Sequence, residues 1–394
     1  MARPLVIWDP AMLRYDLGGA HPLHPLRWEL TWRLAGDLGV LDGIETTAPE
    51  PANDALLATV HTAEYIQAVR RASESGRGDR VGHGLGTADN PTFPGMHDAA
   101  ALIAGGSVAA ARAIARREVD RAVNIAGGLH HAMPDAASGF CVYNDPALAI
   151  ATLLAEGVGR VAYVDVDVHH GDGVQRAFYH DPRVLTVSLH ETPLALWPGT
   201  GFVTESGRGA AAGTAVNVPL PAGTSDAAWL RAFHAIVPSV LRAFAPEVLV
   251  TQHGADSHRE DPLADLNLSV DGQLASYRAL RELAGETAGG RWLALGGGGY
   301  ALVRVVPRVW THLLALVADR DIAPSTPIGE EWIAAAAAAR PMIEPPTSMS
   351  ENGGVAVAFD PWDGQDGTPV DRAISQVRSE IFPLYGLDPF DPRD

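Results

Sequence analysis

Aspartate and histidine side chains alternate directly after an apolar run in the middle of the chain. The run begins at Val161, and Asp165, Asp167 and His169 follow it at every second position. Side chains at i, i+2 and i+4 of an extended strand point to one face, so we expect these three to converge at a strand end. Two buried carboxylates beside an imidazole would be costly without a counter-charge, which a bound cation supplies. The pattern therefore favours a metal site over a solvated carboxylate cluster.

A further candidate ligand follows another apolar run. Asp256 lies a few residues after the run that ends at Thr251. An Asx turn after Gly254 is the structural alternative for this aspartate. With Asp167 and His169, it would give two carboxylates and one imidazole, and would leave positions open for water and substrate. A ligand set of this kind, without cysteine, is typical of catalytic rather than structural zinc.

Two adjacent histidines, His130 and His131, follow a pair of glycines. In isolation, two solvated loop imidazoles would explain them. However, Asp165 and Asp172 flank the proposed metal segment, and each could hold one imidazole. A carboxylate fixes the tautomer of a histidine and raises its basicity, which suits that histidine to activate water.

Four consecutive glycines, Gly296 to Gly299, precede Tyr300. They do not form a phosphate loop, since the lysine and the Walker or dinucleotide spacing are missing. Glycines permit close backbone approach and unusual dihedral angles. Tyr300 is then either a structural tyrosine that caps the core or a hydroxyl donor to a developing oxyanion.

The elements that must position these residues form an alternating series. Short apolar runs span Leu5 to Trp8, Val123 to Ile125, Val161 to Val166, Val184 to Leu189, Val248 to Thr251 and Trp292 to Leu295. Helical patterns span Asp98 to Arg116, Asp145 to Glu156, Ser225 to Phe244 and Asp271 to Ala288. This alternation predicts an α/β fold with a parallel sheet and helices on both of its faces. Ligands of such sheets bind beyond the carboxyl ends of the strands, where the polar clusters fall.

The alternation stops after about Ala318. The alanines from Ala334 to Ala339 predict a helix that ends before Pro341, and Pro345 to Gly354 is typical of a loop. We expect a catalytic domain over residues 1–320, with residues 321–394 as a C-terminal extension packed on the same domain.

The composition indicates a globular protein that binds neither nucleic acid nor a membrane. Of 394 residues, 47% are hydrophobic and 19% are charged, and no apolar run approaches the length of a membrane span. The N-terminus lacks the pattern of a signal peptide. The formal net charge of -18 argues against a nucleic-acid partner, and the single cysteine, Cys141, excludes an internal disulfide framework. We expect a soluble, cytoplasmic protein.

Together, these motifs resemble the zinc-dependent histone deacetylase family, class I type. The ordered motifs are Gly127 to His131, Ser138 to Asp145, Asp165 to Gly173, Thr186 to His190, Pro198 to Gly201, Gly254 to Asp256 and Gly296 to Tyr300. Within the family, other segments are similar to the bacterial acetoin utilisation deacetylases of the AcuC type. These segments are His21 to Arg27, His61 to Tyr65 and Gly84 to Met96.

The resemblance implies the arginase/deacetylase fold, with a central eight-stranded parallel β-sheet, and two kinds of cation. Zn²⁺, with Fe²⁺ as an alternative, would be held by Asp167, His169 and Asp256. A structural potassium ion would be held, partly through backbone carbonyls, by Asp165, Asp167, His169, Ser188 and Leu189.

The resemblance also implies the catalytic roles. His131, paired with Asp172, would be the general base and acid, and His130, paired with Asp165, would give electrostatic support. Tyr300 would stabilise the tetrahedral oxyanion.

Five further residues would contact the substrate or product. Phe140 and Trp197, with Gly139, would line a narrow tunnel for an acyl-lysine stem, and Asp89 at its rim would hold the substrate backbone. Arg27 would lie near an inner channel for acetate release.

The sequence therefore predicts a zinc-dependent amidohydrolase that removes the acetyl group from a lysine side chain of a protein. An acetylpolyamine or other small-molecule amidohydrolase of the same fold is the alternative. A two-metal ureohydrolase would leave His130, His131 and Tyr300 without a role, and an acyl-lysine binding protein would lack one of the site residues. Leu129 and Trp197 replace residues common in relatives, and both could change the tunnel width and the acyl preference. The oligomeric state and the substrate protein stay open.

Overall fold

Eight strands form one sheet in the computed structural model, which describes residues 4–74, 82–323 and 325–394. The strands are β1 Pro4–Ile7, β2 Glu45–Thr47, β3 Arg121–Asn124, β4 Val161–Asp165, β5 Val184–Glu191, β6 Ala215–Leu220, β7 Val248–Gln252 and β8 Trp292–Leu295. Their order is β2-β1-β3-β8-β7-β4-β5-β6, and all neighbouring pairs are parallel. The prediction of an eight-stranded parallel sheet is confirmed.

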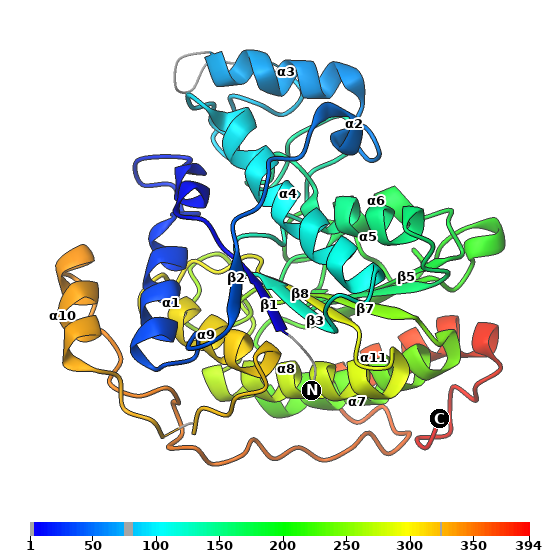
Figure 1. Cartoon of the computed structure of the whole chain (residues 1–394). Coiled ribbons are helices and arrows are strands. Elements are labelled where there is room, and N and C mark those ends of the chain that lie inside the picture. Colours follow the sequence, from blue (N-terminus) through cyan, green and yellow to red (C-terminus); the bar gives the residue numbers. More distant parts are fainter. Residues whose placement is uncertain (1–3, 75–81, 324) are drawn as a thin grey trace.

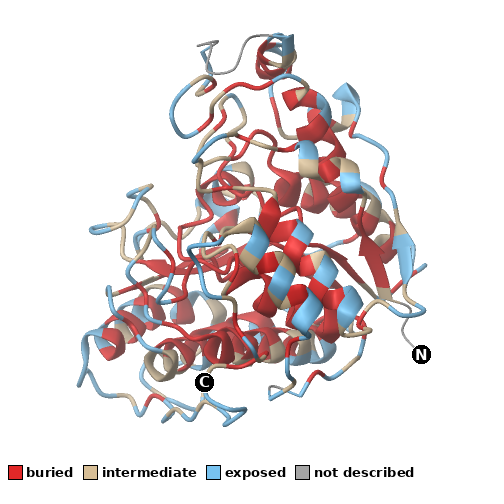
Figure 2. Ribbon diagram, turned by 90° about the vertical axis from the view of Figure 1, so that its left-hand side faces the viewer, coloured by how far each residue is buried: buried red, intermediate tan, exposed pale blue. Residues whose placement is uncertain are grey.

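Helices cover both faces of the sheet (Figure 1). They are α1 Leu26–Asp37, α2 Asp54–Leu57, α3 Ala63–Glu74, α4 Met96–Ala115, α5 Asp145–Ala155, α6 Asp172–Phe178, α7 Asp226–Phe244, α8 Val270–Thr287, α9 Val306–Val317, α10 Glu330–Ala339 and α11 Pro369–Ile381. On one face α4, α5 and α6 contact the sheet, while α7, α8, α9 and α11 contact it on the other. Apart from the edge strand β2, the strands between these layers are almost completely buried (Figure 2), which explains why most of them read as continuous apolar runs.

The apolar runs predicted six of the eight strands and missed β2 and β6. The short edge strand β2 consists of Glu45, Thr46 and Thr47, none of which is buried, so it gives no apolar signal. In β6, Asn217 and Pro219 interrupt the apolar residues. Proline cannot donate a hydrogen bond to a neighbouring strand, and β6 tolerates it because it is the last strand of the sheet.

The extended conformation expected from Asp165 through His169 is wrong, because β4 ends at Asp165. The Asp167 backbone N–H donates to the Asp165 carboxylate (3.1 Å), and the His169 N–H donates to the Asp167 carboxylate (3.0 Å). Aspartate side chains often capture the N–H group two residues later, which turns the chain away from the strand. As a result, the Asp165 side chain does not point to the same place as those of Asp167 and His169, and it contacts His130 instead.

Among the described residues, one helix, α4, is long and apolar enough to cross a membrane by length and composition. The expectation that no run approaches this length is therefore wrong for α4. In the fold, 72% of that stretch is buried inside the protein, where α4 packs on the sheet and on α5. Burial of this kind is typical of a core helix.

The C-terminal residues pack against the parallel-sheet domain in three places. In α10, the buried Trp332 indole donates to the Leu30 carbonyl of α1 (2.9 Å). Residues 348–352 pass between the start of α8 and α9, and Met349 there is fully buried. The third element, α11, contacts α7 and β6.

Arg378 of α11 fixes the end of the chain. Its guanidinium group is buried and donates to the Ala235 carbonyl of α7 (2.7 Å) and to the Asp391 carbonyl of the tail (2.6 Å). The same group lies over the rings of Trp362 and Phe382, at 4.6 and 4.0 Å from their centroids. One side chain thus joins α7, α11 and the tail.

We expect Arg378→Ala to destabilise the protein by about 2–4 kcal/mol, because it leaves buried carbonyl groups without a donor. Chemical denaturation measures the free energy of unfolding. Arg372→Ala, at an exposed position of the same helix, is the matched control and should change it by less than about 0.5 kcal/mol. Equal effects of the two substitutions would contradict this role of Arg378.

Candidate active site

Three buried side chains converge at the carboxyl edge of the sheet. Asp167 and His169 follow β4, and Asp256 follows β7, which is the neighbour of β4. One ligand atom from each lies within 4.8 Å of the other two. His169 Nδ1 is 3.2 Å from Asp167 Oδ1 and 3.2 Å from Asp256 Oδ2. The structure thus brings together the three residues predicted as metal ligands.

The chemistry of this set fits a divalent cation. Burial and the charge of Asp167 raise the pKa of Asp256 to about 6, so the two carboxylates destabilise each other without a cation between them. Two glycines allow the backbone to approach closely, because a Cβ at Gly254 would overlap Asp167 and a Cβ at Gly298 would overlap Asp256. Carboxylate and imidazole ligands suit zinc or iron.

His130 and His131 lie beside this set and have different carboxylate partners. His130 Nδ1 is 2.7 Å from Asp165 Oδ2, and His131 Nδ1 is 2.7 Å from Asp172 Oδ1. Asp165 also accepts the Tyr163 hydroxyl (2.7 Å), which completes a buried chain of hydrogen bonds. The two pairings predicted from the sequence are both present in the structure.

The two imidazoles have opposite protonation preferences. Burial lowers the pKa of His130, but the charges of Asp165 and Asp167 outweigh burial and raise that pKa to about 9. Burial and the charge of His130 lower the pKa of His131 to about 4. Near neutral pH, His130 is therefore the charged partner and His131 the neutral one. With Asp172 accepting from Nδ1, the free lone pair of His131 is on Nε2.

Residues that the sequence analysis did not single out hold the histidine loop. The Asn144 amide donates to the carbonyls of His130 (3.1 Å) and Ala132 (2.9 Å), on either side of His131. Asp145 accepts the N–H groups of the preceding turn, including that of Leu129 (2.8 Å). Asn144 also caps α5, and an Asn directly before a helix that starts with Asp-Pro is the signal that could have identified it.

The position of Tyr300 is fixed by a backbone hydrogen bond and by the glycines that precede it. Its N–H donates to Asp261 Oδ2 (2.8 Å), and Asp261 Oδ1 accepts the Leu263 N–H (3.0 Å). Gly299 has a φ of 135°, which an L-amino acid rarely adopts. Burial and the charges of Asp256 and Asp167 raise the pKa of the Tyr300 phenol well above its usual value, so it remains a hydrogen-bond donor. Asp261 was not predicted from the sequence, since its acceptor role depends on a segment 39 residues away.

A cavity of about 290 Å³ leads to these groups. Its lining residues are Asp89, His131, Gly139, Phe140, His169, Leu196, Trp197, Leu263 and Tyr300. Asp89 is exposed, whereas the ligand His169 is buried, which gives the cavity a rim and a base. The apolar residues Leu196 and Leu263 were missed, because nothing in their local sequence distinguishes them from core leucines.

Aromatic rings form the walls of this cavity. The Trp197 ring contacts the His131 ring edge to face, with centroids 4.6 Å apart, and the Phe140 ring contacts Tyr300 at 5.6 Å. Phe140 adopts a φ of 69°, and a Cβ at Gly139 would overlap both His131 and Trp197. The tunnel predicted for an aliphatic stem is thus lined by the expected residues.

Arg27 and Leu129 lie outside the cavity lining. The buried Arg27 donates to the Gly297 carbonyl (2.8 Å) behind the glycine loop, and its Nε and Nη2 atoms have no hydrogen-bond partner. Leu129 is buried, its backbone N–H donates to Asp145, and it is not among the described residues that line the cavity. Trp197, by contrast, lines it.

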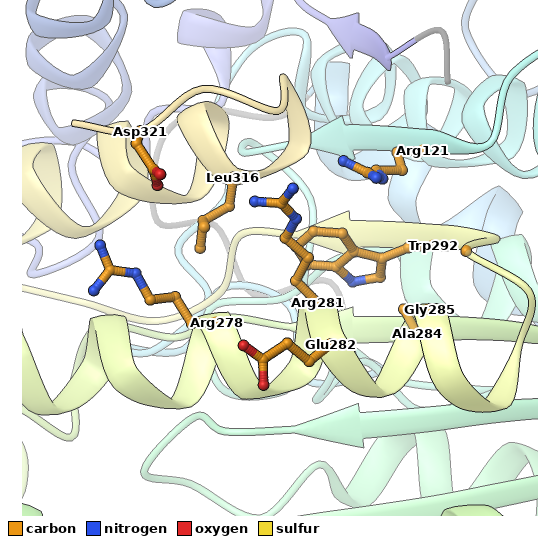
Figure 3. A pocket seen from close by; sticks show the side chains of 10 residues that line it. Arg121, Arg278, Arg281, Glu282, Ala284, Gly285, Trp292, Leu316 and Asp321 are labelled. Atoms are coloured by element: carbon orange, nitrogen blue, oxygen red, sulfur yellow. The ribbon is translucent and has the colours of Figure 1, made fainter. Parts of the chain in front are cut away.

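A second cavity, of about 430 Å³, lies at the opposite edge of the sheet (Figure 3). Arg121 and Trp292 in its lining are the first residues of β3 and β8, whereas the candidate catalytic residues follow the strands. Arg278, Arg281 and Glu282 of α8 form another wall. None of the described residues that line this cavity belongs to the candidate site, so it is not part of the same centre.

Comparison with known proteins explains this arrangement. The sequence profile of the histone deacetylase domain matches residues 21–317. The chain belongs to the histone deacetylase family. Among curated proteins, it is 40% identical over 335 residues to the acetoin utilization protein AcuC of Bacillus subtilis, covering 84% of this chain and 86% of that protein. AcuC of Staphylococcus aureus strain MSSA476 is 36% identical over 329 residues, with 83% and 84% covered.

Solved structures agree with this assignment to the histone deacetylase family. A histone deacetylase homologue from Aquifex aeolicus superimposes with a TM-score of 0.80 and 30% sequence identity, covering 90% of this chain and 96% of that one. The homologue complexed with SAHA gives the same TM-score and identity, with 91% and 97% covered. The arginase/deacetylase fold is therefore confirmed. The chain is a deacetylase of this family and, like its relatives, is expected to use a metal.

For this histone deacetylase family member, we expect Asp256→Ala to lower the affinity for a divalent metal by more than about 100-fold, because it removes one of three protein ligands. Titration of metal-free protein with Zn²⁺ measures the dissociation constant. Asp89→Ala, at the cavity rim, is the control and should bind Zn²⁺ as the wild type does. An unchanged affinity of Asp256→Ala would contradict the ligand assignment.

Proposed function

We propose that the protein is a zinc-dependent lysine deacetylase, which hydrolyses the acetyl amide of N-ε-acetyl-lysine on a protein and releases acetate. One observation carries the proposal: a cavity with aromatic residues in its lining reaches His169 of the buried Asp-His-Asp set, and His131 and the Tyr300 phenol line it beside His169. An acetylated lysine has a slim aliphatic stem with an amide at its tip, which suits such a cavity. The AcuC names of its relatives support a role in acetoin utilisation. We also propose that the protein acts in the cytoplasm.

The residues of the site divide the work of amide hydrolysis. When bound by Asp167, His169 and Asp256, zinc supplies Lewis-acid polarisation of the acetyl carbonyl; Fe²⁺ is the alternative ion. His131 takes a proton from the attacking water as its oxygen bonds to the carbonyl carbon. As the C–N bond breaks, His131 gives that proton to the nitrogen of the leaving lysine amine.

Two further groups stabilise the charge that develops. The Tyr300 phenol donates a hydrogen bond to the carbonyl oxygen as it becomes negative. His130 is held by Asp165 and lies 2.9 Å from His131 Nε2. The nearby carboxylates raise the pKa of His130, and the charge of His130 opposes protonation of His131 before the reaction.

A structural potassium ion is also part of the proposal. Its donors would include Asp165, which pairs in register with Ser188 on the neighbouring strand, and Leu189, which follows Ser188. Backbone carbonyls from these residues would complete the set. Such an ion would offset the negative charge of Asp165 and of the adjacent ligand loop.

Direct comparison of two substrates tests the function. We expect protein with Zn²⁺ or Fe²⁺ to hydrolyse an acetyl-lysine peptide with a kcat/KM at least about tenfold above that for acetylated polyamines. The exposed Asp89 at the rim favours a peptide, because its carboxylate can accept hydrogen bonds from the backbone N–H groups of a peptide. Release of acetate measures both rates, and metal-free protein is the control. Faster hydrolysis of polyamines would favour the small-molecule amidohydrolase, and activity without metal would contradict the zinc mechanism.

The histidine pair should show unequal effects. We expect His131→Ala to lower kcat by at least about 1000-fold, because it removes the group that transfers the proton, and His130→Ala to lower it by less. Both variants should still bind Zn²⁺, since neither residue is a proposed ligand. Steady-state kinetics and metal content decide the outcome. Greater damage from His130→Ala at full metal occupancy would reverse the two roles.

A further inference from the structure

A buried segment of the C-terminal extension lies behind the active-site loops. Met349 is fully buried, and its carbonyl accepts the His312 imidazole of α9 (3.1 Å). The backbone N–H groups of Glu351 and Asn352 donate to Asp271 Oδ2 at the start of α8, at 2.8 and 3.1 Å. The segment is therefore fixed to two helices. It also lies beyond residue 317, where the match to the family profile ends.

The Glu351 carboxylate of this segment contacts two arginine side chains and one histidine. It accepts hydrogen bonds from Arg308 (2.8 Å) and Arg259 (2.6 Å), and it lies 3.1 Å from His258 Nε2. The Glu351 side chain is 10% exposed, so solvent screens these contacts weakly. Burial opposes its charge, but the three partners outweigh burial and hold the pKa of Glu351 at about 2. Glu351 is thus a permanent anion.

The three partners belong to the two chain segments that carry catalytic groups. His258 and Arg259 are two and three residues after the proposed ligand Asp256. Arg308 is in the first turn of α9, which follows Tyr300. Glu351 therefore joins the segment that begins with the proposed metal ligand Asp256 to the segment that begins with the proposed oxyanion donor Tyr300.

Two other contacts join the same segments closer to the site. Asp261 accepts the Tyr300 N–H (2.8 Å), and Arg304 pairs with Glu260 (2.7 Å). With Glu351, these contacts form three parallel connections between residues 256–261 and residues 300–308. The first is at the catalytic tyrosine, the second is on the surface, and the third comes from the extension.

We propose that Glu351 is a positioning residue that sets the distance between Tyr300 and the metal ligand Asp256. The inference rests on the proposed deacetylase function. Tyr300 donates to the carbonyl oxygen, and Asp256 would hold the metal that polarises the same oxygen. A small change in their separation should therefore affect turnover more than substrate binding. If Glu351 only stabilised the fold, its substitution would leave both the kcat and the KM of the folded protein unchanged.

Glu351→Gln tests this role with little change in shape. The amide retains one acceptor oxygen, but it loses the charge and places an NH₂ group against the cationic partners. We expect kcat to fall by about 10- to 100-fold and the Zn²⁺ affinity of Asp256 and its partners to fall measurably, while KM changes by less than about threefold. Glu351→Asp retains the charge and should recover part of the loss.

Two further variants give the smallest and the largest effect with which Glu351→Gln is compared. Asp391→Asn is the matched control, because the pKa of Asp391 is also held at about 2 by an arginine, Arg393, far from the site in the tail. It should leave kcat, KM and Zn²⁺ affinity unchanged. Tyr300→Phe marks the loss of the oxyanion donor itself, about 100- to 1000-fold in kcat, and Glu351→Gln should not exceed it.

The outcomes separate this inference from the proposed function. If the wild type does not hydrolyse the peptide, the function is wrong, and the Zn²⁺ affinities of Glu351→Gln and Asp391→Asn still test the position of Asp256. If Glu351→Gln lowers only the thermal unfolding midpoint, and folded protein retains wild-type kcat, KM and Zn²⁺ affinity, Glu351 is structural and the positioning role is overturned.

Discussion

The repulsion between two buried carboxylates is the constraint on which the rest of this structure depends. Asp167 and Asp256 come from neighbouring central strands and meet where a parallel sheet is covered on both faces. Their charges can coexist there only with a cation and with donors that hold each oxygen. Gln252 and the Gly298 N–H supply such donors to Asp167 Oδ2, both at 2.8 Å. At Gly254 and Gly298, these carboxylates leave no room for a Cβ.

The same negative centre organises the histidines. An imidazole next to Asp165 and Asp167 becomes a cation, and that cation keeps the next imidazole neutral. Two residues of one type, adjacent in the chain, thereby acquire different acid–base properties from their surroundings alone. The assignment of a charged helper and a neutral base follows from this field rather than from any difference between the two residues.

Much of the fold and the site could be predicted from the sequence, because buried parallel strands leave an apolar run and polar clusters follow them. The ligand set and the two histidine–carboxylate pairs belong to such clusters. Asp261 and Glu351 could not be predicted, since each acts by accepting hydrogen bonds from segments that only the tertiary fold brings near. The turn after Asp165 was also missed, because the alternation of Asp and His is equally compatible with a strand and with successive Asx turns.

The strand order has a consequence for the way the chain folds during synthesis. Strands β1 to β3 form one half of the sheet and β4 to β6 the other, and they are joined only through β7 and β8. Each half therefore keeps an open edge until residue 295 has left the ribosome, and the apolar α4 remains partly uncovered until then. Long-range pairing of this kind is slow and exposes strand edges to other chains. The catalytic centre can therefore assemble only once β8, the last central strand, has been inserted between β3 and β7.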